Sequence, residues 1–275
     1  MGSLAEKPVT LANIRNAHPA KKRQFDSMFV WLRCVRQVSF YVTWLFLKLG
    51  ISANQTTYLA ILFGIVGSVL IATGRHTNIV VGSVLINLWF LLDQVDGNIA
   101  RFRQNPTTYG AFVDGLGAHL MYAALFSAVG LAVFRQQDIN PYAFGRCLRT
   151  RGLHIDRVVY LVCGHLTALA LTLRTVVSYK YALFTSEVTG GKASHSGKVT
   201  GSEKERGMLT RIAYWLNNNI LVLAGFILPF CFLASVVGWL DIYLVFYGAA
   251  SLLSLVVITG SYILKLKRGV HAKIV

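Results

Sequence analysis

Charged residues are scarce in this chain. Asp, Glu, Lys and Arg make up 14% of its 275 residues, whereas hydrophobic residues make up 55%. A soluble domain carries about a quarter charged residues, so this composition excludes an ordinary soluble globular protein and a disordered chain. Acidic residues are the scarcest, with 11 against 27 Lys and Arg. Because long apolar stretches recur, we attribute the basic excess to loops that face anionic lipid headgroups, and we expect no nucleic-acid partner.

Cysteine is also rare, and its positions are scattered. Cys34, Cys147, Cys163 and Cys231 form no Cys-x-x-Cys pair and have no His partner at metal-binding spacing. This pattern predicts neither a disulfide framework nor a zinc site. The first 25 or so residues are polar and lack the apolar core and the small-residue cleavage site of a secretory signal.

Six apolar stretches predict an all-α integral membrane bundle. They run over about 54–73, 79–101, 109–134, 158–184, 216–237 and 242–264. Pro229 lies inside the fifth stretch and predicts a kink there. Residues 25–50 mix large apolar side chains with Arg and Lys, which is typical of an amphipathic helix lying on the membrane surface. We therefore divide the chain into a tail with an interfacial helix (1–50), a six-span domain (51–268) and a C-terminal tail (269–275).

The distribution of basic residues predicts the orientation in the membrane. Six spans place both termini on one side. That side holds 20 Lys and Arg, in residues 1–50, 101–103, 180–211 and 265–273, whereas the other side holds six. Since Lys and Arg are enriched in cytoplasmic loops, both termini are expected in the cytoplasm. Short loops fit a bacterial inner membrane.

Three acidic residues, Asp93, Asp96 and Asp114, lie within the second and third spans. An ionisable residue inside a span is costly, and it is a candidate functional residue by default. The other eight acidic residues lie in tails, in loops or at span ends. The three aspartates therefore locate the candidate site.

These aspartates share helix faces with small residues. The spacing i, i+3, i+4, i+7 relates Asp93, Asp96, Gly97 and Ala100, and the spacing i, i+4, i+8 relates Gly110, Asp114 and Ala118. A short turn joins the two helices, so we expect them to pack antiparallel. At about 1.5 Å per residue, Asp96 lies roughly 10 Å and Asp114 roughly 12 Å from that turn. The carboxylates are therefore expected at matching depth on facing helices.

Three close carboxylates would repel one another and take up protons unless a cation neutralised them. Oxygen ligands without His or Cys suit Mg²⁺ or Mn²⁺. Arg101, just past the aspartates, suits a pyrophosphate. Small residues permit close helix approach and leave room for a bulky headgroup; they are Gly97, Ala100, Gly110, Ala111, Gly115 and Gly117.

The segment from Asp93 to Asp114 resembles the signature of the CDP-alcohol phosphotransferase family, D-x2-D-G-x2-A-R-x8-G-x3-D-x3-D. Seven of its eight fixed positions match with the correct spacing. Asn54 and Thr57 also resemble the Asn-x-x-Thr that often opens the first span in this family. An amphipathic helix followed by six spans is the family's architecture, so the resemblance covers most of the chain.

This resemblance implies an enzyme that transfers a phosphoalcohol group from a CDP-alcohol, often CDP-diacylglycerol, to an acceptor hydroxyl and releases CMP. It implies that Asp93, Asp96 and Asp114 bind a pair of Mg²⁺ or Mn²⁺ ions. The CDP moiety is assigned to Asn54, Thr57, Asp96, Gly97, Ala100, Arg101 and Gly110. The family often forms homodimers, which we carry over as an expectation.

Ala118 is the one departure from the signature, where the family has a fourth aspartate that is thought to activate the acceptor hydroxyl. The loss of a general base typically costs about 10²–10⁴ in rate. Three explanations stay open: a deliberate Asp→Ala change, a natural member with weak or no catalysis, or another group acting as base. We favour the first because the rest of the signature is intact. The neighbouring His119 lies about 100° around the helix from the Asp114 face.

Arg174 lies inside the fourth span, where an unpaired charge is expensive. It either pairs with the aspartates or a backbone carbonyl, or it lines the acceptor pocket. Two other functions remain open for the whole chain. A cation transporter could use the same carboxylates, although no second copy of the acidic pattern is present as an inverted repeat would require. A non-catalytic binder of a CDP-lipid would explain Ala118.

Overall fold

A computed structural model describes residues 8–105, 108–136, 156–189 and 219–274 of the chain. Helices account for almost all of these residues, and no strand occurs among them, which confirms the all-α prediction. The helices are α1 (Leu11–Asn16), α2 (Ala20–Asp26), α3 (Val30–Lys48), α4 (Ala53–Ala72), α5 (His76–Phe102), α6 (Thr108–Gln136), α8 (Arg157–Thr189), a π-helical turn (Leu223–Ile227), α10 (Leu228–Val237) and α11 (Leu240–Ile274).

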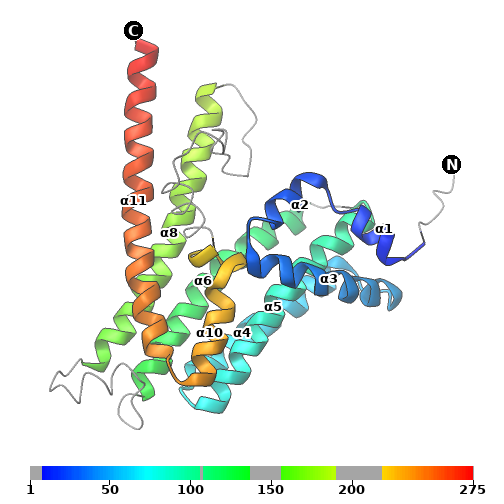
Figure 1. Cartoon of the computed structure of the whole chain (residues 1–275), viewed down its shortest axis with the longest axis horizontal. Helices are drawn as coiled ribbons and strands as arrows, with labels where there is room; N and C mark the ends of the chain where they lie inside the picture. The colour runs from blue at the N-terminus through cyan, green and yellow to red at the C-terminus, as the bar shows by residue number, and fades with distance from the viewer. Residues whose placement is uncertain (1–7, 106–107, 137–155, 190–218, 275) are drawn as a thin grey trace.

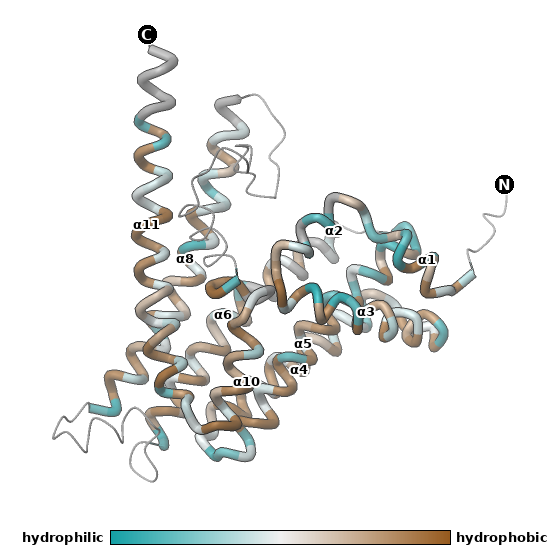
Figure 2. Tube along the Cα trace, viewed as in Figure 1, coloured by the Kyte–Doolittle hydropathy of each residue, from teal (hydrophilic) through white to brown (hydrophobic). Residues whose placement is uncertain are grey.

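Five of these helices are long and apolar enough to cross a membrane. The apolar segments are Ala53–Ala72, His76–Phe102, Gly115–Gln136, Arg157–Ser186 and Leu240–Lys267. Figure 2 shows that hydrophobic residues dominate the bundle that they form. The chain is therefore a helical integral membrane protein. The predicted count of six spans is not confirmed, because the remaining apolar helix, Gly225–Val237, is shorter.

The fifth predicted span is broken at its N-terminal end and not at Pro229. Gly225 has non-helical backbone angles, φ −93° and ψ −132°. A Cβ atom there would lie 1.9 Å from the carbonyl oxygen of Asn219, so only glycine fits. Pro229 lies in the first turn of α10, where its missing N–H has no intrahelical partner to lose. The expected kink at Pro229 is therefore wrong, and the break lies four residues earlier.

A close contact between glycines holds α4 against α5. A Cβ atom at Gly67 would lie 2.8 Å from the carbonyl oxygen of Gly82, and one at Gly82 would lie 2.5 Å from that of Gly67. Such contacts between small residues let helix backbones approach closely in a membrane. Ser52 and Gln55 form a capping box at the start of α4, which satisfies backbone donors there. The first turn of α4, which precedes Thr57, is thereby stabilised.

Helix α3 lies across the bundle beside α5 and is not one of the five apolar helices (Figure 1). Its inward face is buried and consists of Leu32, Val35, Arg36, Ser39, Phe40, Thr43 and Leu47. Its other face exposes the apolar side chains of Val38, Tyr41 and Leu45, and Leu49, directly after the helix, is exposed as well. An apolar face open on the outside of a helix that packs at the edge of a bundle fits the interfacial location expected for residues 25–50.

Candidate functional site

The C-terminal half of α5 carries Asp93 and Asp96 one helical turn apart. The Asp96 side chain is buried, with 7% of its surface exposed. The hydroxyl of Thr57, from the second turn of α4, donates a hydrogen bond of 2.6 Å to Oδ2 of Asp96. Asn54 lies three residues earlier on α4 and is exposed. The structure thus joins the Asn-x-x-Thr segment to the acidic signature through one charge-assisted contact.

Gly97 and Arg101 form the next part of the signature. The guanidinium of Arg101 folds back over Gly97, because a Cβ atom at Gly97 would lie 3.1 and 3.2 Å from its two terminal nitrogens. One of these nitrogens donates a 2.8 Å hydrogen bond to Oδ1 of Asn98. Ala100 is partly buried on the same helix. Because residue 97 is glycine, the Arg101 guanidinium can lie close to this turn of α5. The positive charge held there suits a diphosphate.

The two helices of the signature are not a closely packed pair in the described part of the chain. Helix α4 packs against both α5 and α6. The antiparallel approach of α5 and α6 expected at the level of Asp96 and Asp114 stays a prediction, because the Asp114 side chain lies outside the described part of the chain. The glycine contact described above draws α4 onto α5. On its α6 side, a Cβ atom at Gly64 of α4 would lie 2.7 Å from the sulfur of Met121. Helix α4 thus contacts both helices of the signature, and its small residues allow the close approach on each side.

Helix α6 includes the second half of the signature. Gly110 lies in its first turn and is partly buried. The side chains of Asp114 and Ala118 lie outside the part of the chain that the structure describes, so their distance from Asp96 is not part of the site's geometry. His119 is partly buried, and its Nδ1 atom has no hydrogen-bond partner among the described residues.

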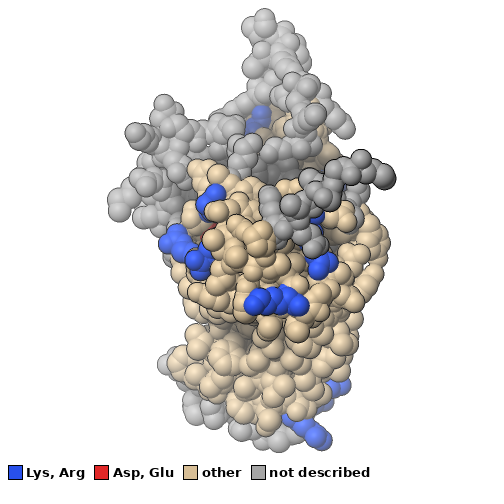
Figure 3. Space-filling view, turned by 90° about the vertical axis from the view of Figure 1, so that its right-hand side faces the viewer, with Lys and Arg blue, Asp and Glu red and all other residues tan. Residues whose placement is uncertain are grey.

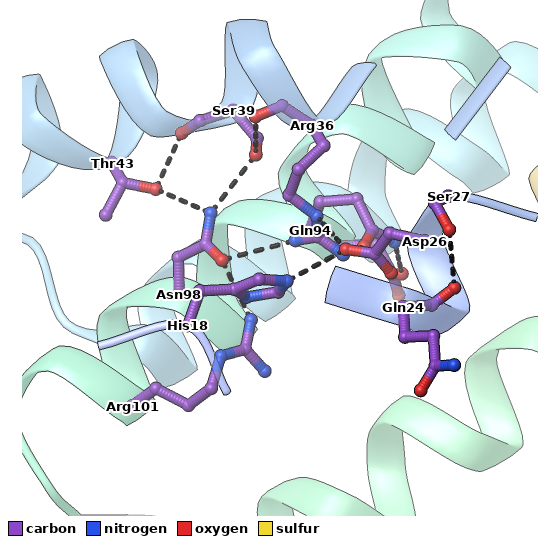
Figure 4. Close-up of polar contacts among 11 residues, drawn as sticks. His18, Gln24, Asp26, Ser27, Arg36, Ser39, Thr43, Gln94, Asn98 and Arg101 are labelled. Atoms are coloured by element: carbon purple, nitrogen blue, oxygen red, sulfur yellow. Dashed lines mark hydrogen bonds and ion pairs between the residues drawn. The ribbon is translucent and has the colours of Figure 1, made fainter. Parts of the chain in front are cut away.

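A buried polar network that the sequence analysis missed lies behind the signature (Figure 4). Its centre is Arg36 of α3, which is 4% exposed. Nε of Arg36 donates to Oδ2 of Asp26 at 2.7 Å, one terminal nitrogen donates to Oδ1 of Asn98 at 3.2 Å, and the other donates to Oε1 of Gln94. Gln94 in turn donates to Oδ2 of Asp93 at 2.9 Å. The N-terminal helices are thus linked to the signature by an unbroken chain of hydrogen bonds.

The charges in this network can be assigned. Burial raises the pKa of Asp26, but the hydrogen bond from His18 and the charge of Arg36 outweigh it, so the pKa lies below its usual value. Burial lowers the pKa of His18, and the nearby Arg36 and Arg101 add to this, whereas Asp26 opposes it. Nε2 of His18 lies 2.9 Å from Oδ2 of Asp26. We therefore assign a neutral His18 that donates to an ionised Asp26, beside a cationic Arg36.

A signal for this network is present in the sequence. Arg36, Ser39 and Thr43 follow one another at helical spacing on the same stripe as the buried Leu32 and Phe40. The amide nitrogen of Asn98 donates to the hydroxyl of Ser39 at 3.1 Å and to that of Thr43 at 3.2 Å. Three polar residues on the apolar stripe of an amphipathic helix indicate buried partners, because burying them unpaired is costly.

Comparison with protein families decides the assignment. The family model of CDP-alcohol phosphatidyltransferase matches residues 50–247, which include both parts of the signature, the Asn-x-x-Thr segment and most of the bundle. The chain belongs to this family. A comparison with curated proteins finds no match. The CDP-alcohol phosphatidyltransferases transfer a phosphoalcohol group from a CDP-alcohol, so the chain is a member of a transferase family.

The residues at the site fit the divalent metal on which this family generally depends. Asp93 and Asp96 supply carboxylate oxygens one turn apart, which are the ligand atoms that Mg²⁺ and Mn²⁺ prefer. The described residues contain no group of three or more acidic, His or Cys side chains that could hold a metal, and the third expected ligand, the Asp114 carboxylate, lies outside them. Thr57 and Gln94 donate hydrogen bonds to the two carboxylates, and such contacts orient carboxylates that bind a metal.

Arg174 has a structural partner in this member of the family. One of its terminal nitrogens donates a 2.8 Å hydrogen bond to the carbonyl oxygen of Leu221, in the irregular segment before α10. Of the partners expected from the sequence, the backbone carbonyl is therefore the one observed. This contact satisfies a carbonyl that the broken helix leaves without an intrahelical donor.

Proposed function

We propose that this CDP-alcohol phosphatidyltransferase transfers a phosphatidyl group from CDP-diacylglycerol to the hydroxyl of a small acceptor and releases CMP, in a reaction that depends on Mg²⁺ or Mn²⁺. The observation that carries the proposal is the contact between Thr57 and Asp96. It joins the Asn-x-x-Thr segment to the acidic signature, two segments that are 39 residues apart at this contact and that both resemble the family.

Each part of the site has a role in this reaction. The acceptor oxygen forms a bond to the phosphorus attached to the donor alcohol, the phosphoanhydride bond breaks, and CMP leaves with the bonding electrons. Asp93, Asp96 and Asp114 would hold the divalent ions, which neutralise phosphoryl charge when bound. Arg101 binds the diphosphate above Gly97, and Asn54, Thr57, Ala100 and Gly110 line the CDP site.

The proton of the acceptor hydroxyl needs a base, and Ala118 supplies none. This residue supports a second candidate function, that of a protein that binds a CDP-lipid but does not turn it over. We also propose that Arg174 lines the acceptor pocket: one of its terminal nitrogens donates to the carbonyl of Leu221, and a guanidinium has further N–H groups that can donate to an acceptor. A role of the carboxylates in cation transport has no further support in the described residues.

The proposed orientation follows from charge and helix arrangement, whereas the homodimer is carried over from the family resemblance. We propose a homodimer in a bacterial inner membrane, with both termini and the site on the cytoplasmic side. Helix α1 and the C-terminal end of α11 lie on the same side of the bundle (Figure 1). On the face drawn in Figure 3, a belt without Lys or Arg separates basic side chains above from others below, as expected for a bundle that spans a membrane.

The decisive experiment measures CMP release in detergent with CDP-diacylglycerol, Mg²⁺ or Mn²⁺ and a panel of acceptor alcohols. The unmodified chain is compared with Ala118→Asp, and Ala118→Asn serves as the control of similar size without a basic carboxylate. Restoring the base is expected to raise the rate by about 10²–10⁴-fold, and the productive acceptor identifies the reaction. CDP binding without CMP release in every variant would favour the non-catalytic binder, and absence of CDP binding would contradict both functions.

A further inference from the structure

We propose that Arg36 is a positioning residue for the transferase site and that it orients a metal ligand and the diphosphate-binding arginine at the same time. This inference rests on the proposed function, because it assigns the metal to Asp93 and the CDP diphosphate to Arg101. Arg36 lies on α3, outside the family signature and outside the segment that the family model matches.

The Arg36 side chain divides its hydrogen bonds among three partners. One terminal nitrogen reaches Gln94, whose amide nitrogen donates to Asp93. The other terminal nitrogen reaches Oδ1 of Asn98, the same atom that accepts from Arg101. A planar guanidinium holds its two terminal nitrogens at a fixed separation. Gln94 and Asn98 are one turn apart on α5, so this geometry fixes both relays against one rigid group.

Arg36 also determines the orientation of the amide groups of Gln94 and Asn98. Because Arg36 can only donate, it selects the oxygen of each amide, which leaves the nitrogen of Gln94 to donate to the Asp93 carboxylate. The nitrogen of Asn98 donates to Ser39 and Thr43, and this fixes its oxygen toward Arg36 and Arg101. Without Arg36, nothing among these contacts would prevent Gln94 from turning its oxygen toward Asp93, where two acceptors would repel each other.

Buried polar contacts hold Arg36 in place. The ion pair with Asp26 is buried, since the side chains of Arg36 and Asp26 are 5% and 7% exposed. Asp26 is also bonded to His18, from the connection between α1 and α2. Buried ion pairs add little to stability compared with apolar packing, so stability alone is a weak reason for this network. The network reaches Asp93 and Arg101, and these contacts provide a functional reason for its presence.

A control is available because α3 has a second polar anchor away from α5. The amide of Asn219, before α10, accepts from the backbone N–H of Val30 at 3.0 Å and donates to the carbonyl of Met28 at 3.0 Å. Asn219 is fully buried. The variant Asn219→Ala therefore loosens the start of α3 without removing either relay, and it reports the effect of weaker docking of the N-terminal helices alone.

The test uses the purified full chain in detergent and two binding measurements, so it does not depend on turnover. Mn²⁺ binding without nucleotide is followed by electron paramagnetic resonance, and CDP binding at saturating Mn²⁺ is followed by calorimetry. Gln94→Leu should weaken Mn²⁺ binding by about 10–100-fold, the usual effect of removing an outer-shell partner, and leave CDP binding within about twofold. Asn98→Leu should show the reverse pattern.

Arg36→Lys keeps a buried charge opposite Asp26 but cannot span all three partners, so it should weaken both bindings in a protein that still folds. Asn219→Ala should change neither by more than about twofold. The proposal is overturned if Gln94→Leu and Asn98→Leu leave both affinities unchanged, or if Asn219→Ala weakens them as much as Arg36→Lys does. If the unmodified chain binds neither Mn²⁺ nor CDP, the proposed function fails and this inference falls with it.

Discussion

The hydroxyl of Thr57 is the contact whose removal tests the candidate site most directly. Its hydrogen bond to Oδ2 of Asp96 is 2.6 Å long, and Asp96 is buried. Thr57→Val keeps the shape of the side chain and removes only this donor, together with a local bond to the carbonyl of Ala53. The carboxylate of Asp96 then loses the group that fixes its orientation in the space between α4 and α5.

The expected magnitude follows from two independent estimates. A hydrogen bond to a charged group contributes about 1.5–3 kcal/mol, and about 1.4 kcal/mol corresponds to a factor of ten in affinity. Removal of an outer-shell partner of a metal ligand typically weakens metal binding by about 10–100-fold. Both estimates give a loss of Mn²⁺ affinity of at least about tenfold in Thr57→Val, measured by electron paramagnetic resonance of free Mn²⁺.

The neighbouring residue provides a matched control. Thr56 is fully buried, and its hydroxyl donates only to the carbonyl of Ser52 within its own helix. Thr56→Val therefore introduces the same chemical change one position away without touching Asp96, and it should leave Mn²⁺ affinity within about twofold. Thr57→Ser, which restores a hydroxyl, should recover most of the loss. Equal affinities in Thr57→Val and Thr56→Val would refute the assignment of Asp96 as a metal ligand held by Thr57.

The long helices were predictable because each carries about twenty apolar residues, and the bilayer demands that length. The break in the fifth predicted span was not predictable from hydropathy, because hydropathy does not report backbone conformation. Its stretch is as apolar as the others, but the approach of the Asn219 carbonyl to Gly225 breaks it. Pro229 indicates a helix boundary and not the kink expected from the sequence, since proline is favoured in the first turn of a helix.

The acidic face of α5 was predictable for a similar reason. Helical periodicity alone places Asp93 and Asp96 on one face, and the family signature adds Thr57. The burial of Arg36 was not predictable in this way, because a basic residue in an interfacial helix is usually solvated. Only the burial of Ser39 and Thr43 on the same stripe distinguishes it from a surface charge. Helical periodicity predicts which residues share a face, but it does not predict contacts between segments that are far apart in sequence.

Further predictions test the close contacts and the charge assignment. Gly97→Ala places a methyl group 3.1 Å from a nitrogen of Arg101; since that side chain is flexible, the fold should persist while CDP affinity measured by calorimetry falls about tenfold. Gly82→Ala meets the backbone oxygen of Gly67 at 2.5 Å, which cannot move away alone, so the thermal midpoint in detergent should fall clearly, as overpacking costs about 1–3 kcal/mol. The pKa of His18 is lowered from 6.5 on folding. The unfolded chain therefore binds a proton more readily than the folded chain, and the stabilisation present above about pH 6.5 is lost as the pH falls toward the folded pKa. Protonation would also leave Nδ1 of His18 as a buried donor without a partner among the described residues. Limited proteolysis of the N-terminal helices should accelerate as the pH falls below about 6.5, and His18→Gln should flatten this dependence; an unchanged pH profile in that variant would contradict the assignment of a neutral His18.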